Sequence, residues 1–344
     1  MTEEINELEL SMKDFDIKHE SHSKLNYLET HFQELFPKYS DYELLKDIDN
    51  YRHGTGKLFK VLKHFFEEEM YKCHGGRGVN TPMEVLSNDV EMEKILLFIS
   101  TKPNFYNGNE ITNVKSFFRN AGRIAQKVAN FPIKEATIIY ERYTKKGDIV
   151  YDPSCGFGSR MSACMLNGRH YIGTDPNPTL CSKLKNLAEY YTEYAKCTSN
   201  CAIFKHGSEV FNKEFVNSID FSFTSPPYYN IERYGSDNGQ SIIKFPEYIQ
   251  WLNGFVTPTI KNIIQYTKVG GLIAINIKNM TSGKKHKLFD DWFKIMIDNN
   301  LEHVENISIK QSSKRDYKDK HYTGVKSDYG EKEQVMVFRF RGRK

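Results

Sequence analysis

The sequence predicts an α/β protein with a doubly wound sheet of seven strands. From about residue 131 onward, strand-like and helix-like segments alternate, which is typical of parallel strands joined by crossover helices. Several strand-like segments end in turns that contain glycine or proline. The last two strand-like segments have no obvious helix between them, so we expect them to pair antiparallel at one edge of the sheet.

The part of the chain before the alternation is predicted to be helical and polar. Within it, the run KLFKVLKHFFEEEMYKC places Leu58, Leu62, Phe65 and Phe66 near one helical face. We therefore expect a helical N-terminal segment over residues 1–110 and a sheet-containing domain over residues 111–344.

Two further helices are expected before the first strand. The run NVKSFFRNAGRIAQKVAN carries a basic residue at every fourth position, so these side chains line one face, either as a solvated surface or as a track for phosphates. The run FPIKEATIIYERYTKK follows it. The strands are then expected in GDIVYDPSC, RHYIGTD, AIFKHG, IDFSFTS, GGLIAINIK, HVENISIK and QVMVFRF.

Composition indicates a globular protein that meets an anion. Of 344 residues, 39% are hydrophobic, no run is long enough to cross a bilayer, and the acidic N-terminus is unlike a signal peptide, so we expect a cytoplasmic protein. Residues 1–50 carry 13 acidic and 5 basic side chains, which leaves a basic remainder. The six scattered cysteines predict neither a disulfide framework nor a metal site.

The first two strands end in residues that suit a nucleoside-containing ligand. Gly156 and Gly158 follow the first strand, where glycines allow a ligand to approach the backbone closely. Their spacing is shorter than the dinucleotide fingerprint GxGxxG, which argues against NAD. Asp175 ends the second strand and could accept hydrogen bonds from two ribose hydroxyls. Asp175 could instead cap the helix that follows.

The fourth strand ends in the rigid stretch FTSPPYYN. Pro226 and Pro227 fix the backbone and end the strand, while Ser225 and Tyr228 flank them with a hydroxyl and an aromatic ring. Such a corner could hold a flat, polar group. The alternative is a buried end of a strand with packed tyrosines.

Together these motifs resemble those of the amino-group DNA methyltransferases. DPSCGFGS resembles their DPFCGSGT block, TDPNP their acidic cofactor motif, TSPPY their catalytic tetrapeptide (S/N/D)PP(Y/F), and FPIKEATIIYERYTKKGDIV their HPTQKP-type helix. The resemblance covers residues 131–340 and implies a Rossmann-like methyltransferase sheet that binds S-adenosyl-L-methionine. The order of blocks, with the tetrapeptide last and no large insertion, leaves target recognition to residues 1–110 or to the loops at 232–245 and 311–332.

The resemblance also implies roles for individual residues. The tetrapeptide supplies the catalytic residues Ser225, Pro226, Pro227 and Tyr228. The residues expected to bind the cofactor are Phe131, Asp152, Pro153, Ser154, Cys155, Gly156, Gly158, Asp175 and Ser208, with Glu209 as a substitute for Ser208. Asp152 and Pro153 would either brace the glycine loop or meet the methionine end of the cofactor.

The expected substrate is DNA, methylated on cytosine N4 or adenine N6, with cytosine slightly favoured. A duplex base must be flipped out to reach such a pocket. Tyr229, Lys314, Arg315 and Tyr317 are expected to bind it, because basic residues interleaved with aromatic ones suit nucleic acid. Expected partners extend to a second copy of the chain or a restriction nuclease. Methylation of an RNA guanine amine or a protein glutamine amide remains the alternative.

Overall fold

The computed structural model describes most of the chain outside its first 35 residues. The described residues are 36, 38–75, 80–100, 125, 128–234, 239–280, 286–308 and 333–342, with the backbone alone at 95–100. Several expectations lie outside them, namely those for Lys314, Arg315 and Tyr317 and for the basic side chains Lys115, Arg119, Arg123 and Lys127.

The chain forms two compact units. The first contains α5 (Pro82–Leu86) and α6 (Asp89–Ser100). Thr81 caps α5 in a capping box with Glu84, which satisfies two backbone N–H groups at the start of that helix.

The second unit contains the sheet and residues 39–66. Its helices are α3 (Asp41–Arg52), most of α4 (Phe59–Tyr71), α8 (Ile133–Tyr143), α9 (Ser159–Leu166), α10 (Pro178–Glu193), α11 (Ser241–Lys244), α12 (Tyr248–Trp251), α13 (Thr257–Tyr266) and α14 (Leu288–Asp298).

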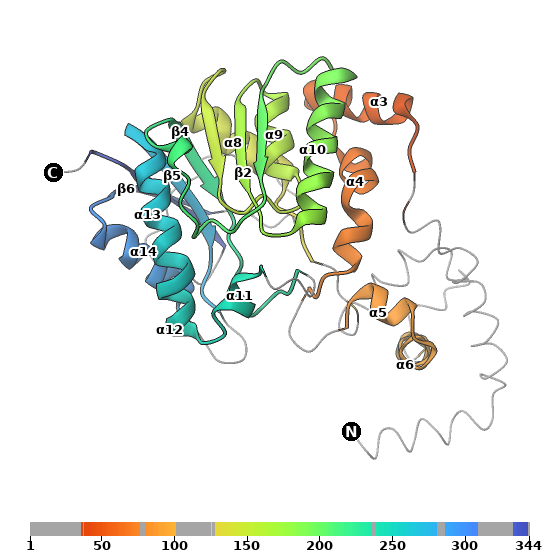
Figure 1. Ribbon diagram of the computed structural model, residues 1–344. Coiled ribbons are helices and arrows are strands. Elements are labelled where there is room, and N and C mark those ends of the chain that lie inside the picture. Colours follow the sequence, from red (N-terminus) through yellow and green to blue (C-terminus); the bar gives the residue numbers. More distant parts are fainter. Residues whose placement is uncertain are drawn as a thin grey trace, which may run out of the picture. The chain divides into compact units, whose positions relative to one another are not determined.

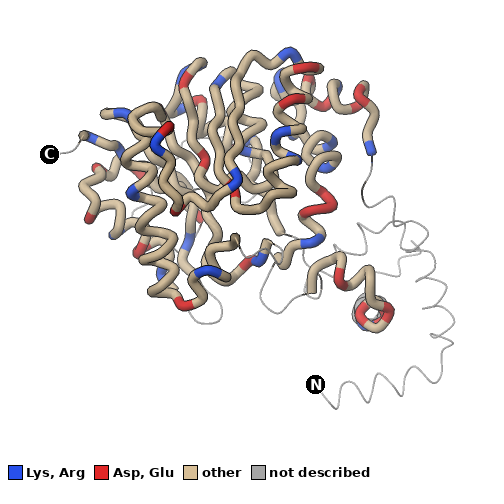
Figure 2. The backbone as a smooth tube through the Cα atoms, viewed as in Figure 1, with Lys and Arg blue, Asp and Glu red and all other residues tan. Residues whose placement is uncertain are grey.

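Within the second unit, helix α3 packs through one apolar face. A capping box of Ser40 and Glu43 starts the helix, and Leu44, Ile48 and Tyr51 are buried at helical spacing. The Tyr51 hydroxyl lies 2.6 Å from Thr137 Oγ1 of α8. Asp47, next to this face, accepts hydrogen bonds from the backbone N–H groups of Lys60 and Val61 at the start of α4. Figure 2 shows acidic and basic residues interspersed along this unit.

The sheet has seven strands in the order β3-β2-β1-β4-β5-β7-β6 (Figure 1). The strands are β1 (Ile149–Asp152), β2 (His170–Thr174), β3 (Cys201–Phe204), β4 (Ile219–Thr224), β5 (Thr267–Ile277), β6 (Glu302–Ser308) and β7 (Gln334–Arg339). Strands β3, β2, β1, β4 and β5 are parallel, whereas β7 runs antiparallel to both β5 and β6. The expected seven-stranded fold with antiparallel pairing at one end is confirmed, and β7 lies second from the edge.

Alternate residues of the central strands cover opposite faces of the sheet. Phe221 and Phe223 of β4 face α8, where both rings meet the Tyr140 ring edge-on. Tyr151 of β1 faces the other way and meets Tyr266 of α13 at 5.4 Å. The second face is covered by α13 and α14, with Trp292 fully buried there. Helices therefore cover both faces, which explains the nearly continuous apolar runs of the parallel strands.

Candidate active site

The loop after β1 adopts a backbone that requires glycine. Gly156 and Gly158 have φ angles of 59° and 75°, in the left-handed region that residues with a Cβ rarely adopt. Gly158 caps α9, and no side chain bonds the first N–H groups of that helix. A Cβ on Gly158 would come within 2.6 Å of the Phe66 ring. The loop is therefore shaped both by its dihedral angles and by close packing.

We expect Gly158→Ala to destabilise the protein by about 3 kcal/mol, from left-handed strain of about 1 kcal/mol plus about 2 kcal/mol of overpacking against Phe66. Gly54→Ala is the matched control, because Gly54 has a φ of 74° and open space around its Cβ position. It should cost about 1 kcal/mol. Urea unfolding of both variants measures the difference, and equal costs would contradict the proposed clash.

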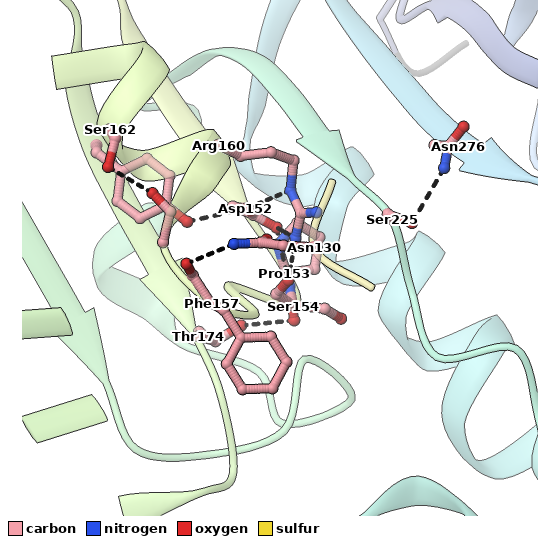
Figure 3. Close-up of polar contacts among 12 residues, drawn as sticks. Asn130, Asp152, Pro153, Ser154, Phe157, Arg160, Ser162, Thr174, Ser225 and Asn276 are labelled. Atoms are coloured by element: carbon pink, nitrogen blue, oxygen red, sulfur yellow. Dashed lines mark hydrogen bonds and ion pairs between the residues drawn. The ribbon is translucent and has the colours of Figure 1, made fainter. Parts of the chain in front are cut away.

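Asp152 lies at the end of β1, and side chains and backbone of neighbouring residues form hydrogen bonds with its carboxylate (Figure 3). Its carboxylate is fully buried and accepts hydrogen bonds from Arg160 Nε at 2.8 Å, Tyr171 Oη at 2.9 Å and Ser154 N at 3.1 Å. Arg160 also donates to the Ser154 carbonyl. Burial lowers the pKa of Arg160, but the charge of Asp152 outweighs it and leaves that pKa above its usual value. Of the two expected roles for Asp152, these contacts favour bracing of the loop.

Neighbouring segments hold the same loop from outside. Asn130 Nδ2 donates to the Phe157 carbonyl at 2.9 Å, and Thr174 Oγ1 donates to the Pro153 carbonyl at 3.1 Å. Phe131 is buried, with its ring edge-on to Phe223 and 5.8 Å from the Arg160 guanidinium. The segment before α8 thus lies against the glycine loop.

Asp175 lies at the C-terminal end of β2 and is half-buried. Its carboxylate accepts a hydrogen bond from Asn177 N at 3.0 Å, and the Gly156 N–H also bonds it. Burial raises its pKa to about 7, although these two hydrogen bonds lower it. The helix that follows is capped by Asn177, whose side chain accepts from Leu180 N. Asp175 is therefore not the cap of α10, and its carboxylate is adjacent to the glycine loop.

The loop after β3 differs from expectation at Ser208. The Ser208 side chain is buried and its hydroxyl lies 2.8 Å from Thr259 Oγ1 of α13, so in this structure it is directed toward that helix. Glu209, the expected substitute, folds back over Gly207 and pairs with Lys244 of α11 at 2.8 Å. Glu209 therefore supplies a carboxylate at this strand end, one position after Ser208.

The loop after β4 places Ser225 and Tyr228 in one hydrogen-bond network. Asn276 Nδ2 on β5 lies 3.1 Å from Ser225 Oγ, 3.3 Å from Tyr228 Oη and 2.7 Å from Oε1 of Glu333, which directly precedes β7. Figure 3 shows the contact between Asn276 and Ser225. Burial raises the pKa of Tyr228, the charge of Glu333 raises it further, and a hydrogen bond from Ser225 lowers it.

Tyr229 lies in the core instead of facing a substrate. Its side chain is 6% exposed, and its hydroxyl donates to the Pro246 carbonyl at 2.6 Å. Its ring packs against Tyr248 and Trp251. The backbone at Tyr229 has a φ of 57°, which is strained for an aromatic residue. The substrate contact expected of Tyr229 is therefore corrected to an anchoring role, because packing and this hydrogen bond hold the strained turn.

Sequence reasoning missed four residues of the site, Asn130, Arg160, Asn276 and Glu333. Asn276 left a signal, because it is a polar residue within the apolar run GGLIAINIK of a buried strand. The other three left none, since their partners are distant in sequence or are backbone carbonyls.

Two negative findings apply to the described part of the chain. No helix there is long and apolar enough to span a membrane. No group of three or more His, Cys, Asp or Glu side chains there could hold a metal ion. Its six cysteines are free thiols, and burial raises the pKa of Cys155.

Comparison with known proteins confirms the resemblance to the amino-group DNA methyltransferases. A family model described as DNA methylase matches residues 87–186, a range that contains the glycine loop and Asp175 but ends before the tetrapeptide. No curated protein is significantly similar to this chain.

Solved structures that are similar to this chain include two bacterial methyltransferases. A TehB-like SAM-dependent methyltransferase from Corynebacterium glutamicum is 15% identical, with a TM-score of 0.41, over 65% of this chain and 94% of that chain. The 1,6-didemethyltoxoflavin-N1-methyltransferase of Burkholderia thailandensis, solved with S-adenosylhomocysteine, is 11% identical, with a TM-score of 0.39, over 61% and 78%.

Residues 87–186 of this chain are therefore similar to the DNA methylases. The residues present fit S-adenosylmethionine, the cofactor that this similarity implies. The glycine loop opens the backbone, the first N–H groups of α9 have no side-chain cap, and the half-buried Asp175 carboxylate suits hydroxyl donors. These groups would hold the carboxylate and the ribose of the cofactor, which when bound supplies an electrophilic methyl group on its sulfonium sulfur.

Proposed function

We propose that this protein methylates an exocyclic amine of a DNA base, cytosine N4 or adenine N6, with cytosine slightly favoured. One observation carries the proposal: Ser225 and Tyr228 of the SPPY tetrapeptide lie at the same sheet edge as the glycine loop and Asp175. Because β1, β2 and β4 are parallel, their carboxyl ends meet at that edge, where a cofactor and an acceptor can be adjacent.

The tetrapeptide has the groups that this reaction requires. An exocyclic amine is a poor nucleophile, because its lone pair is delocalised into the ring. Acceptors for its two N–H bonds favour a pyramidal nitrogen with an available lone pair. The Ser225 hydroxyl and the Pro226 carbonyl are those acceptors, and the two prolines hold the carbonyl in place.

The Tyr228 ring would stack on the face of the base. Its hydroxyl is bonded to Glu333 and Asn276, which limits rotation of the ring. A base in duplex DNA would have to be flipped out of the helix to reach this loop. Residues 1–110 and the segment with Lys314, Arg315 and Tyr317 are proposed to contact the DNA around that base.

The test is mass spectrometry of nucleosides from unmodified DNA incubated with the protein and S-adenosylmethionine. We expect N4-methyldeoxycytidine or N6-methyldeoxyadenosine to appear. Ser225→Ala should lower the rate about fivefold, because it removes one neutral hydrogen-bond acceptor, worth about 1 kcal/mol, from the transition state.

If DNAs of diverse sequence stay unmodified although the cofactor binds in calorimetry, DNA is the wrong substrate. The same assay would then be repeated with RNA and with glutamine-containing protein. Unchanged activity of Ser225→Ala would instead contradict the role given to the serine.

A further inference from the structure

Three neighbouring strands bring a carboxylate to the tetrapeptide from a distant part of the sequence. Thr224 pairs with Ile275, so Ser225 lies next to Asn276. Asn276 pairs with Val335, and Glu333 precedes Val335 by two residues, so it shares the same face of the sheet. The register thus places the three polar residues side by side.

Within this group a line of hydroxyls leads from Ser225 to the carboxylate. Ser225 is hydrogen-bonded to Tyr228, whose hydroxyl donates to Glu333 Oε1 at 3.2 Å. Asn276 Nδ2 contacts all three residues, and its donation to the carboxylate at 2.7 Å fixes which side of the amide faces the group. Its Oδ1 is fully buried without a hydrogen-bond partner in the described residues, which is an unfavourable arrangement for a buried amide oxygen.

We propose that Glu333 receives, through Tyr228, the proton that the base amine loses on methylation. This inference rests on the function proposed above. It assigns Glu333 and Asn276 as positioning residues, since neither touches the base in the proposed arrangement. Glu333 is half-buried, so its carboxylate can return the proton to solvent between turnovers.

The step balances in atoms and charge. The bond from sulfur to the methyl carbon breaks, its electron pair stays on sulfur, and the amine lone pair forms the new bond to carbon. An N–H proton then passes to Ser225 Oγ, the Ser225 proton to Tyr228 Oη, and the Tyr228 proton to Glu333. The products are a methylated amine, a neutral thioether and a protonated Glu333. Ser225 Oγ has two lone pairs, so it can accept from both Asn276 and the amine.

The test is the pH dependence of kcat for Glu333→Gln, at saturating S-adenosylmethionine so that titration of Asp175 does not affect the result. In the wild type kcat should rise with pH, because the relay must end on a group that can accept a proton. Glu333→Gln should lower kcat about tenfold, remove that rise, and leave the KM for DNA and the Kd for the cofactor unchanged. Tyr228→Phe, which keeps the ring and removes the hydroxyl, should remove the rise in the same way. Glu333→Asp should restore part of it.

The matched control is Glu232→Gln, because Glu232 is the other carboxylate whose charge acts on Tyr228. It should keep the rise with pH. A Glu333→Gln enzyme with the wild-type pH profile would overturn the inference and leave the proposed function intact, whether its kcat is normal or lowered by instability. A wild-type protein that methylates no DNA would overturn both.

Discussion

Replacing Arg160 with methionine should destabilise the protein by about 3–5 kcal/mol. The Arg160 and Asp152 side chains are 5% and 0% exposed, and the guanidinium is the positive partner of a carboxylate that water cannot reach. Removal of one partner leaves an uncompensated buried charge, and this penalty, rather than the worth of the pair itself, sets the size of the effect. The glycine loop should loosen as well, because Arg160 also holds the Ser154 carbonyl.

Chemical unfolding of the variant measures this change. The double variant Asp152→Asn/Arg160→Met should be more stable than Arg160→Met alone, because the charge is then absent from both sides. Lys268→Met is the control: it breaks an ion pair with Asp220 in which the lysine is 43% exposed, and it should cost under about 1 kcal/mol. A similar small cost for Arg160→Met would contradict the account of the buried pair.

Asp175→Asn should weaken S-adenosylmethionine binding about 100-fold at pH 8. A carboxylate accepts strong hydrogen bonds from two ribose hydroxyls, each worth about 1.5–3 kcal/mol, and an amide replaces at most one of them at lower strength. Isothermal titration calorimetry gives the Kd. A change of less than about threefold would show that Asp175 does not contact the ribose.

The raised pKa of Asp175 predicts that cofactor binding depends on pH. Because the pKa of Asp175 is raised to about 7, the free protein must ionise it before the cofactor binds tightly, so the Kd should fall about tenfold per pH unit between pH 5 and 7 and level off above. Asp175→Asn should show no such slope.

Without cofactor, the free energy of unfolding should fall as pH rises, whereas cofactor binding becomes tighter. A carboxyl group whose folded pKa lies above its unfolded value stabilises the folded state at low pH, and this contribution is lost as pH rises through about 7. Thermal melting of wild type against Asp175→Asn isolates this contribution. A wild-type curve parallel to that of the variant from pH 4 to 8 would contradict the raised pKa.

The sequence predicted the sheet because its signals are local. Strand runs, crossover helices and their ends follow from periodicity and from glycine and proline, and the two-residue repeat of side chains then determines the faces. The order of the strands could not be predicted from local signals, because β7 inserts between β5 and β6. No nearby residue encodes that pairing.

Parts of the candidate site were predictable for the same reason. Gly156, Gly158 and Asp175 are adjacent to their own strand ends, so the motif and its location coincide. Ser208 and Tyr229 show where such reasoning fails. Each stands in the right loop, but its side chain turns into the core to meet Thr259 or Pro246, partners that only the tertiary structure brings near. Glu333 is the converse case, a residue far from every motif that lies beside the tetrapeptide.

The reversal of β7 has a consequence for how this enzyme could acquire new targets. Since β6 runs parallel to β5 and β7 runs against it, Ser308 at the end of β6 and Gln334 at the start of β7 both lie at the edge where the tetrapeptide lies. The segment 309–332 is therefore anchored at this edge through the described residues on either side of it. Exchange of this segment between related enzymes should transfer substrate preference, while the sheet and its cofactor residues stay unaltered.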